Sequence, residues 1–278
     1  MKPPLKVAIT GASGQLGRAL LAQLPEHWVV DALDNPRLDI CDWRDVSSRI
    51  EDIEPHLIIH AAAATDVDRC ERDPGWAYRM NALGTRNVAR AASHVGAGLV
   101  YVSTNYVFDG ELDRPYHEFD QPNPISHYGA SKLAGEREIA AAECWIVRTA
   151  MLYAPEGRNF VNTMRRLMAE RDRLSVVHDQ FGNPTYAIDL AAAIIELVDV
   201  APTGVYHTVN TGRASWYEWA AEIKRITSAE VDLDPIPASA FPRDADPPRN
   251  GELTSLALPA YGIELPDWRD ALVRALRA

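Results

Sequence analysis

Short apolar runs alternate along this chain with longer segments in which apolar residues recur every three or four positions. The first run, Leu5–Thr10, predicts a buried strand, and the leucine stripe after it predicts a helix over Gln15–Leu24. Similar runs predict further strands at Trp28–Leu33, His56–His60, Gly98–Ser103, Cys144–Thr149, Leu174–Val177 and Gly204–His207. Strands that alternate with helices predict an α/β fold built on a doubly wound parallel sheet, which is Rossmann-like.

The predicted helices indicate how the chain divides. After the helix at Gln15–Leu24, a second helix is predicted to begin near Trp43. Further helices are predicted over Pro74–Val95, Asn159–Arg171, Ala187–Val200, Trp216–Thr227 and Pro266–Arg277. We expect residues 1–150 to form a dinucleotide-binding Rossmann domain and residues 151–278 to form mainly a smaller α/β C-terminal substrate lobe. The chain is expected to return to the first domain within residues 174–212. The stretch Pro235–Gly251 is rich in Pro and Asp and predicts a loop.

Composition narrows the classes of partner. A net charge of −11 and a pI near 5.2 argue against a broad nucleic-acid surface, which requires clustered Lys and Arg. The three cysteines form no CxxC or Cys/His cluster, so the sequence predicts no metal site and no disulfide framework. No apolar run reaches the ~18 residues that a bilayer span requires. No membrane partner is therefore expected, and the expected location is the cytoplasm.

A glycine-rich turn, G-A-S-G-Q-L-G at residues 11–17, joins the first predicted strand to the first predicted helix. Strand, glycine turn and helix in this order are the context in which a glycine triad binds a dinucleotide. Gly11 permits the tight turn, Gly14 lets a pyrophosphate approach the backbone, and Gly17 lets the helix pack closely on the strand. Although the spacing is GxxGxxG rather than GxGxxG, this turn is the predicted nucleotide site.

Charged residues beyond the second strand are candidates for the adenosine half of the cofactor. Asp34 is placed to hold the ribose hydroxyls, which favours NADH. Arg37 lies three residues further on and can instead meet the 2′-phosphate of NADPH, so the choice between the two cofactors stays open. Asp39 is a candidate for an adenine contact or for the cap of a loop.

Two strand ends carry further candidates. The third strand runs into A-A-A-A-T-D-V-D at residues 61–68, where small side chains let a flat cofactor lie against the backbone. An alanine-rich helix explains the same composition equally well. The fourth strand ends at Ser103 and Thr104, at the edge where doubly wound sheets bind their ligands. A hydroxyl there can hydrogen-bond a substrate carbonyl, and the alternative is an ordinary strand-end turn.

Tyr128 and Lys132 stand four residues apart in a segment whose composition favours a helix, S-H-Y-G-A-S-K-L-A-G-E. Positions i and i+4 share a helix face, so the phenol and the ammonium are expected to point into the same space. A neighbouring cation favours the phenolate, so we expect the lysine to lower the pKa of the tyrosine. Such a phenol can donate or accept the proton in a carbonyl reduction. The alternative is a Tyr–Lys pair on an exposed helix face.

These residues resemble the extended short-chain dehydrogenase/reductase superfamily and, within it, the dTDP-4-dehydrorhamnose reductase family. The similar motifs span nearly the whole chain: GASGQLG at 11–17, LDICD at 38–42, AAAATDVDRCE at 61–71, STNYVFDG at 103–110, YGASKLAGE at 128–136, VRTAMLY at 147–153, GRNF at 157–160, DQFGNPT at 179–185 and LPDWRDAL at 265–272. YGxSKxxGE, DQxGxPT and the LPDW tail are together specific to that family.

The resemblance implies NADPH- or NADH-dependent reduction of the 4-keto group of a nucleotide-activated 6-deoxy-4-keto-hexose, in the family dTDP-4-dehydrorhamnose to dTDP-rhamnose. Tyr128 would donate a proton to the sugar C4 oxygen, Lys132 would hold the nicotinamide ribose, and Thr104 would place its hydroxyl beside the keto group. The implied cofactor contacts are Gly11, Gly14, Gln15, Leu16, Asp39, Ile40, Ala61, Ala62, Ala63, Tyr128 and Lys132. The implied substrate contacts are Thr104, Asn105, Met151, Asn159 and Gln180.

Three departures from the family pattern fall on the substrate side. Asn105 replaces the usual Asp of S-T-D-Y-V-F and removes a charge beside the substrate. Met151 replaces the usual Trp of T-S-W-V-Y and removes an aromatic surface. In the segment usually written R-P-x-N-S-x-L, Pro247 stands in place of the Arg and Gly251 in place of the Ser. The reaction type is therefore more firmly indicated than the sugar or the nucleobase.

Two other interpretations stay open. The first is an epimerase or 4,6-dehydratase of the same superfamily, although dehydratases typically carry Asp-Glu after the active-site Thr, where this chain has Asn105-Tyr106. The second is a non-catalytic nucleotide-binding subunit like the regulatory subunit of methionine adenosyltransferase. The retained Tyr128, Lys132 and Thr104 weigh against it, because a binding role needs no tuned phenol. The oligomeric state is also open, and a homodimer is one candidate.

Overall fold

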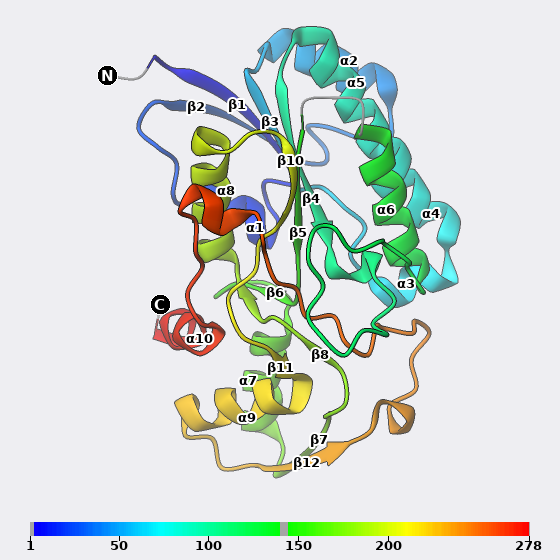
Figure 1. The fold of residues 1–278 in the computed structure, drawn as a ribbon, viewed down its shortest axis with the longest axis vertical. Helices are drawn as coiled ribbons and strands as arrows, with labels where there is room; N and C mark the ends of the chain where they lie inside the picture. The colour runs from blue at the N-terminus through cyan, green and yellow to red at the C-terminus, as the bar shows by residue number, and fades with distance from the viewer. Residues whose placement is uncertain (1–2, 140–143, 278) are drawn as a thin grey trace.

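The computed structural model describes residues 3–139 and 144–277. Its centre is a six-stranded sheet in the order β10-β5-β4-β3-β1-β2, in which every neighbouring pair is parallel (Figure 1). The strands are β1 (Leu5–Thr10), β2 (Trp28–Leu33), β3 (Leu57–His60), β4 (Gly98–Thr104), β5 (Cys144–Thr149) and β10 (Gly204–His207). The predicted α/β, Rossmann-like class is confirmed. The strand order reverses between β1 and β3, where such sheets open a crevice.

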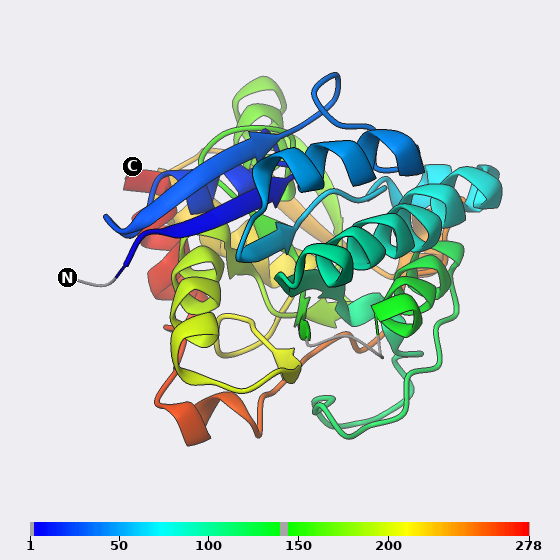
Figure 2. The ribbon, with the colours of Figure 1, turned by 90° about the horizontal axis from the view of Figure 1, so that it is seen from above.

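Helices cover both faces of this sheet, as the views in Figure 1 and Figure 2 show. Helices α1 (Gln15–Leu21) and α8 (Ala187–Val200) pack on one face. Helices α2 (Trp43–Ile53), α5 (Thr85–Val95) and α6 (His127–Ile139) lie on the other face. The central strands are apolar on both sides, so a helical layer on each side is required to keep them out of water.

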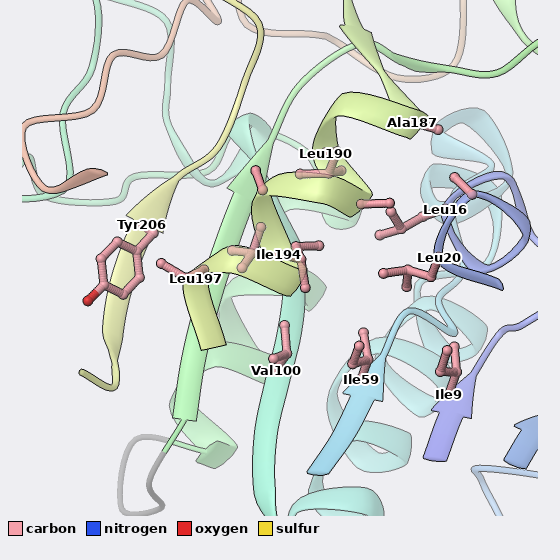
Figure 3. Close-up of a cluster of buried hydrophobic side chains, with 14 of the residues drawn as sticks. Ile9, Leu16, Leu20, Ile59, Val100, Ala187, Leu190, Ile194, Leu197 and Tyr206 are labelled. Carbon is pink, nitrogen blue, oxygen red and sulfur yellow. The ribbon is translucent and has the colours of Figure 1, made fainter. Parts of the chain in front are cut away.

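The layer between α8, α1 and the sheet is the largest cluster of buried apolar side chains (Figure 3). Side chains of α8 and α1 point toward the strands there, and the buried set includes Ile9, Leu16, Leu20, Ile59, Val100, Leu190, Ile194 and Leu197. Burying one Leu or Ile side chain contributes about 1.5–3 kcal/mol. This layer therefore fixes β1 and α1, and with them the glycine turn between the two elements.

A smaller group of elements lies beyond the carboxyl ends of the strands, at the lower end of Figure 1. Its members are α7 (Phe160–Glu170), α9 (Trp216–Thr227), α10 (Trp268–Arg277) and the parallel pair of β7 (Arg173–Val177) and β12 (Asp232–Ile236). The short pairs β6 (Leu152–Tyr153) with β9 (Thr185–Tyr186) and β8 (Phe181–Gly182) with β11 (Ala214–Ser215) complete it. Trp219 and Trp268 are buried at its centre. The domain boundary at residue 150 stays a prediction.

Several helical segments differ from the sequence prediction. Helix α1 ends at Leu21 rather than Leu24. Pro25 disfavours helical backbone at Leu24. The helical region predicted over Pro74–Val95 is divided into α4 (Pro74–Tyr78), a π-helical turn η1 (Arg79–Gly84) and α5. A further short helix, α3 (Val67–Arg72), begins after Asp66, whose carboxylate accepts from the Arg69 N–H.

The strands of the smaller group also differ from expectation. The predicted strand Leu174–Val177 lies in β7, which pairs with β12 and not with the central sheet. Strand β12 escapes prediction because its sequence, D-L-D-P-I, is rich in residues that disfavour strands. Pro235 is tolerated because a two-stranded sheet has only edge strands. The predicted loop Pro235–Gly251 thus begins inside a strand, and it also contains the 3₁₀ turn η3 (Ala238–Ala240).

Candidate active site

The turn after β1 requires glycine at two positions. Gly11 has a φ of +69°, and a Cβ atom there would lie 2.7 Å from the Ala62 backbone nitrogen. A Cβ atom on Gly17 would lie 2.4 Å from the Gly11 carbonyl oxygen. Both distances are shorter than any real contact, so the turn and α1 keep this close approach only with glycine. Gly14 begins α1 in an extended conformation, and its N–H donates to the Gly11 carbonyl at 3.0 Å.

The residues predicted for the adenosine half lie near this turn. Asp34 Oδ2 accepts a hydrogen bond from the Ser13 N–H at 2.8 Å, which places its carboxylate against the glycine turn. Asp39 is the cap of a loop, since its Oδ1 accepts from the Cys41 N–H at 2.9 Å. Ile40 is buried, and its side chain packs against Gly84. The assignment of these residues to a cofactor stays a prediction.

Residues 61–63 form the opposite wall of the crevice. Ala61, Ala62 and Ala63 are partly exposed and non-helical, so the interpretation of this run as an alanine-rich helix is wrong. The Ala61 N–H donates to the Thr10 carbonyl at 3.1 Å, and the backbone of Ala62 faces Gly11. The ends of β1 and β3 therefore meet as backbone against backbone.

Tyr128 and Thr104 lie together at the ends of α6 and β4. The Thr104 hydroxyl is near enough to the Tyr128 phenol to lower its pKa, which opposes the effect of burial. Tyr106 packs edge-on against the Tyr128 ring, with 5.3 Å between the centroids. Tyr128 also packs against the small cluster that contains Ala64, directly after the wall formed by residues 61–63. The phenol therefore lies beside the end of β4 and next to the segment that follows β3.

The prediction that Lys132 lowers the pKa of Tyr128 is wrong. Burial raises the pKa of the Tyr128 phenol, where a lower value was expected from the neighbouring lysine. Among the described residues no hydrogen bond joins the two side chains: the Lys132 Nζ donates to the Val102 carbonyl at 2.7 Å and lies 4.1 Å above the Tyr101 ring. Burial lowers the pKa of Lys132 to about 7, and the charge of Glu136 opposes this shift. The i, i+4 rule predicts the direction of side chains but not the desolvation around them.

Asn81 is a buried site residue for which the sequence analysis proposed no role. It lies in the π-helical turn η1 and is fully buried. Its Oδ1 accepts from the Ala64 N–H at 2.7 Å, and its Nδ2 donates to the Ala64 carbonyl at 3.0 Å and to the Ser131 hydroxyl at 2.9 Å. Asn81 therefore ties the crevice wall after β3 to α6. An Asn within a helical pattern was the only signal in the sequence.

A buried ion pair lies beneath α6 and was also missed. Glu136 Oε2 lies 2.7 Å from Arg148 Nη2, and the Ser103 hydroxyl donates to Glu136 Oε1 at 2.5 Å. Glu136 belongs to the YGASKLAGE motif, but nothing in the sequence shows that Arg148 of β5 faces it. The charges of the pair neutralise each other inside the protein and join α6 to β4 and β5.

Two of the three departures from the family pattern contact each other. The Asn105 Nδ2 donates to the Gly251 carbonyl at 3.0 Å, and a Cβ atom on Gly251 would lie 2.3 Å from that nitrogen. Met151 has a φ of +43°. A Cβ atom on Gly182 would lie 2.7 Å from the Met151 sulfur, so the Met151 side chain packs directly on Gly182. Gly182 is in the strand that runs beside Asn250-Gly251. Asn105, Met151 and Gly251 therefore occupy one region around β8.

Asn159 and Gln180 complete the predicted substrate contacts. Asn159 caps α7, with its Oδ1 accepting from the Asn162 N–H, and its Nδ2 donates to Gln15 Oε1 at 2.9 Å. Two predicted site residues, Asn159 and Gln15, are thus in direct contact. Gln180 is partly exposed between β7 and β8. The side chain of Leu16, which belongs to α1, is buried in the core. Only the backbone of this residue remains available to a ligand.

No three His, Cys, Asp or Glu side chains within residues 3–139 and 144–277 gather as a metal site. Over the same ranges no helix combines the length and the apolar character that a bilayer crossing requires.

The fold and the site define a class. A parallel doubly wound sheet, a glycine turn at its switch point, and a Tyr–Thr pair with a buried lysine are the arrangement of a Rossmann-like protein of the short-chain dehydrogenase/reductase type. The glycine cradle fits a dinucleotide, because its backbone is left uncovered where a Cβ would obstruct it.

The family follows from the comparison with known proteins. The family described as the RmlD substrate binding domain matches residues 5–278, and the chain belongs to this family. A dTDP-4-dehydrorhamnose reductase from Streptomyces griseus is 40% identical over 97% of this chain and 92% of its own length. The predicted family is therefore confirmed.

Solved structures agree with this result. The crystal structure of dTDP-4-dehydrorhamnose reductase from Bacillus anthracis in complex with NADP has a TM-score of 0.96 and 42% identity, and the match covers 99% of each chain. A UDP-glucose 4-epimerase from Thermus thermophilus in complex with NAD has a TM-score of 0.85 but only 21% identity, over 99% of each chain. The second likeness extends to the fold alone.

Proposed function

We propose that this chain is an NAD(P)H-dependent reductase of the 4-keto group of a nucleotide-activated 6-deoxy-4-keto-hexose, with dTDP-4-dehydrorhamnose as substrate and dTDP-rhamnose as product. Membership of the family and the reductases named among its relatives support the activity. The observation that carries the proposal at the site is the packing of Tyr128 beside Thr104 and against the cluster of Ala64, in the segment that follows β3.

The roles of the residues follow from their positions. Gly11, Gly14 and Gly17 leave backbone open for the pyrophosphate, and Asp34 stands where the adenosine ribose would bind. A reduced nicotinamide held by this turn would supply the hydride that C4 of the sugar receives. Tyr128 donates its phenolic proton to the C4 oxygen, so that the carbonyl becomes a hydroxyl. The raised pKa of Tyr128 keeps the phenol protonated at neutral pH, which is the form that a reduction consumes.

Lys132 and Thr104 support this transfer. The Lys132 ammonium has three N–H donors, and one of them donates to the Val102 carbonyl. The other two remain for ribose hydroxyls. Thr104, at the end of β4, is proposed to place its hydroxyl beside the keto group, next to the phenol. Asn105, Met151, Asn159 and Gln180 are proposed to surround the nucleotide-sugar.

Purified protein with a dTDP-4-keto-6-deoxy sugar and each reduced nicotinamide tests the proposal. We expect loss of the absorbance of the reduced nicotinamide and appearance of the 4-hydroxy sugar. The same assay with UDP- and GDP-sugars tests the nucleobase of the substrate. If the reduced nicotinamide is consumed only with one of these sugars, the substrate carries that nucleobase and not thymine. Tight binding to another protein without turnover would instead favour the regulatory-subunit interpretation.

Location and assembly form part of the same proposal. Three free thiols, Cys41, Cys70 and Cys144, suit a reducing compartment, which supports a cytoplasmic location. We keep the homodimer as the proposed assembly, and sedimentation of the purified chain tests it. A mass near 30.8 kDa at all concentrations would contradict the dimer.

A further inference from the structure

Two side chains of opposite charge are bonded to Ser13, in the glycine turn. The Ser13 N–H donates to Asp34 Oδ2 at 2.8 Å, and the Ser13 carbonyl accepts from the Arg18 guanidinium. Asp34 follows directly after β2, whereas Arg18 belongs to α1. The two polar backbone atoms of one residue therefore bring both charges to the place proposed for the adenosine ribose of the cofactor.

The guanidinium of Arg18 has a defined place between the glycine turn and the segment before α7. A Cβ atom on Gly157 would lie 2.9 Å from Arg18 Nη2, and Gly157 has a φ of +87°. The Gly157 carbonyl accepts from Asn162 Nδ2 at 3.0 Å, and the same nitrogen donates to the Pro155 carbonyl at 3.1 Å. Glycine at position 157 therefore leaves the space that the guanidinium occupies, and Asn162 of α7 holds this segment in position.

Most N–H donors of the Arg18 side chain remain available to a ligand. A guanidinium carries five such donors, and the residue is exposed. Within residues 3–139 and 144–277 its hydrogen bond goes to the Ser13 carbonyl and no carboxylate is ion-paired with it. Arg37, the sequence-based candidate for a 2′-phosphate, is also exposed, but in the same described ranges no hydrogen bond or ion pair fixes its side chain. Arg18 is therefore the arginine that the fold holds at the turn.

The two charges at Ser13 act in opposite directions on the two cofactors. NADPH carries a 2′-phosphate, with about two negative charges at neutral pH, where NADH has a hydroxyl. The Asp34 carboxylate can accept from that hydroxyl but repels the phosphate, whereas a guanidinium can donate two parallel hydrogen bonds to phosphate oxygens. We propose that Arg18 is a specificity-determining residue that binds the 2′-phosphate of NADPH and offsets its repulsion by Asp34. This inference deepens the proposed function and rests on it.

Calorimetry with two adenosine nucleotides tests this role without the reaction. The probes 2′,5′-ADP and 5′-AMP differ by the 2′-phosphate alone. In Arg18→Gln the Kd of 2′,5′-ADP should rise about tenfold, as for the loss of one charge-assisted hydrogen bond, and the Kd of 5′-AMP should change little. An equal rise for both nucleotides would place Arg18 at the 5′-phosphate, and no rise for either would exclude a contact with the nucleotide. Either result would overturn the proposal.

Arg171→Gln is the matched control. Arg171 is exposed at the carboxyl end of α7, whereas Gly157 precedes the amino end of that helix. The substitution removes the same charge at a distance from the turn, and both Kd values should stay at the wild-type level. Arg18→Lys keeps the charge and should lose less affinity for 2′,5′-ADP than Arg18→Gln. A larger loss in Arg37→Gln than in Arg18→Gln would transfer the role to Arg37 and overturn the proposal.

Turnover gives a second measurement. In Arg18→Gln the ratio of kcat/KM for NADPH to that for NADH should fall about tenfold, with the loss in the KM for NADPH, because the lost contact is remote from the reacting carbon. An unchanged ratio would contradict the proposal. If the wild type binds both nucleotides but reduces no keto sugar, the proposed function fails, and the calorimetry still decides whether Arg18 binds the 2′-phosphate.

Discussion

Glu136 and Arg148 face each other in the buried space beneath α6, with 2.7 Å between Oε2 and Nη2. A second bond joins Arg148 Nε to Glu136 Oε1 at 3.0 Å. Glu136 also stands one helical turn from Lys132, and its charge raises the pKa of that ammonium. The pair therefore has two tasks: it anchors α6 to β5, and it supplies the negative charge that helps the buried lysine to stay protonated.

Removing this charge should be costly. Glu136→Gln leaves Arg148 without a counter-charge in a buried site, and we expect the free energy of unfolding to fall by about 3–5 kcal/mol. Urea unfolding with an unchanged m-value measures this. Glu170→Gln removes a partner from the exposed pair with Arg166 and should change little. If both variants unfold at the wild-type midpoint, the ion pair does not anchor α6.

Tyr128→Phe should lower kcat by a factor of about 10² to 10⁴, the usual effect of losing a general acid. The phenyl ring still packs against Tyr106, so cofactor binding should remain. The rate is measured by nicotinamide absorbance and the binding by nicotinamide fluorescence. Tyr78→Phe, on the exposed side of α4, serves as the control. Near wild-type turnover in Tyr128→Phe would show that another group donates the proton.

Asp34 is expected to disfavour the 2′-phosphate of NADPH. Its carboxylate lies against the glycine turn through the Ser13 N–H. Asp34→Asn retains an acceptor for that N–H and removes the charge. The ratio of kcat/KM for NADPH to that for NADH should rise about tenfold, as for a loss of ~1.4 kcal/mol of repulsion. Asp52→Asn on α2 controls for net charge, and an unchanged ratio in Asp34→Asn would contradict this role.

His60 should make the protein sensitive to acid. Its ring bonds Thr10 at 2.7 Å and Thr85 at 3.1 Å, and burial lowers its pKa to about 3. Below about pH 6.5 the His60 imidazole binds a proton in the unfolded chain but stays neutral in the folded chain. The stability is therefore fully present above about pH 6.5 and is lost as the pH falls toward 3, at about 1.4 kcal/mol per pH unit.

The test compares urea unfolding of the wild type and of His60→Gln between about pH 7 and pH 4, where histidine normally titrates. The variant should be less stable at neutral pH and should lose less on acidification. His94→Gln, at an exposed site, should keep the wild-type slope. The same slope in His60→Gln would show that this ring is not a source of acid sensitivity.

The sequence predicts those features that depend on local order. Apolar periodicity locates the six strands of the sheet, and the spacings around Gly11 and Tyr128 locate both ends of the site. Contacts between distant segments are beyond it: Asn105 meets Gly251 from 146 residues away, and Asn159 meets Gln15 from 144. The raised pKa of Tyr128 is equally out of reach, since it depends on burial by residues from other elements.

The wide turn η1 has a consequence for the evolution of this chain. An α-helix advances about 100° per residue, so the extra residue in Arg79–Gly84 changes the helical phase between α4 and α5. Ala77 and Asn81 can thereby turn toward Ala64 while Val88 turns toward the core of the sheet. Deleting one residue would restore regular α-helical winding and keep the helix. It would also rotate the side chains of α4 or of α5 away from their present contacts. Homologous chains should therefore tolerate new side chains in this segment more readily than a new length.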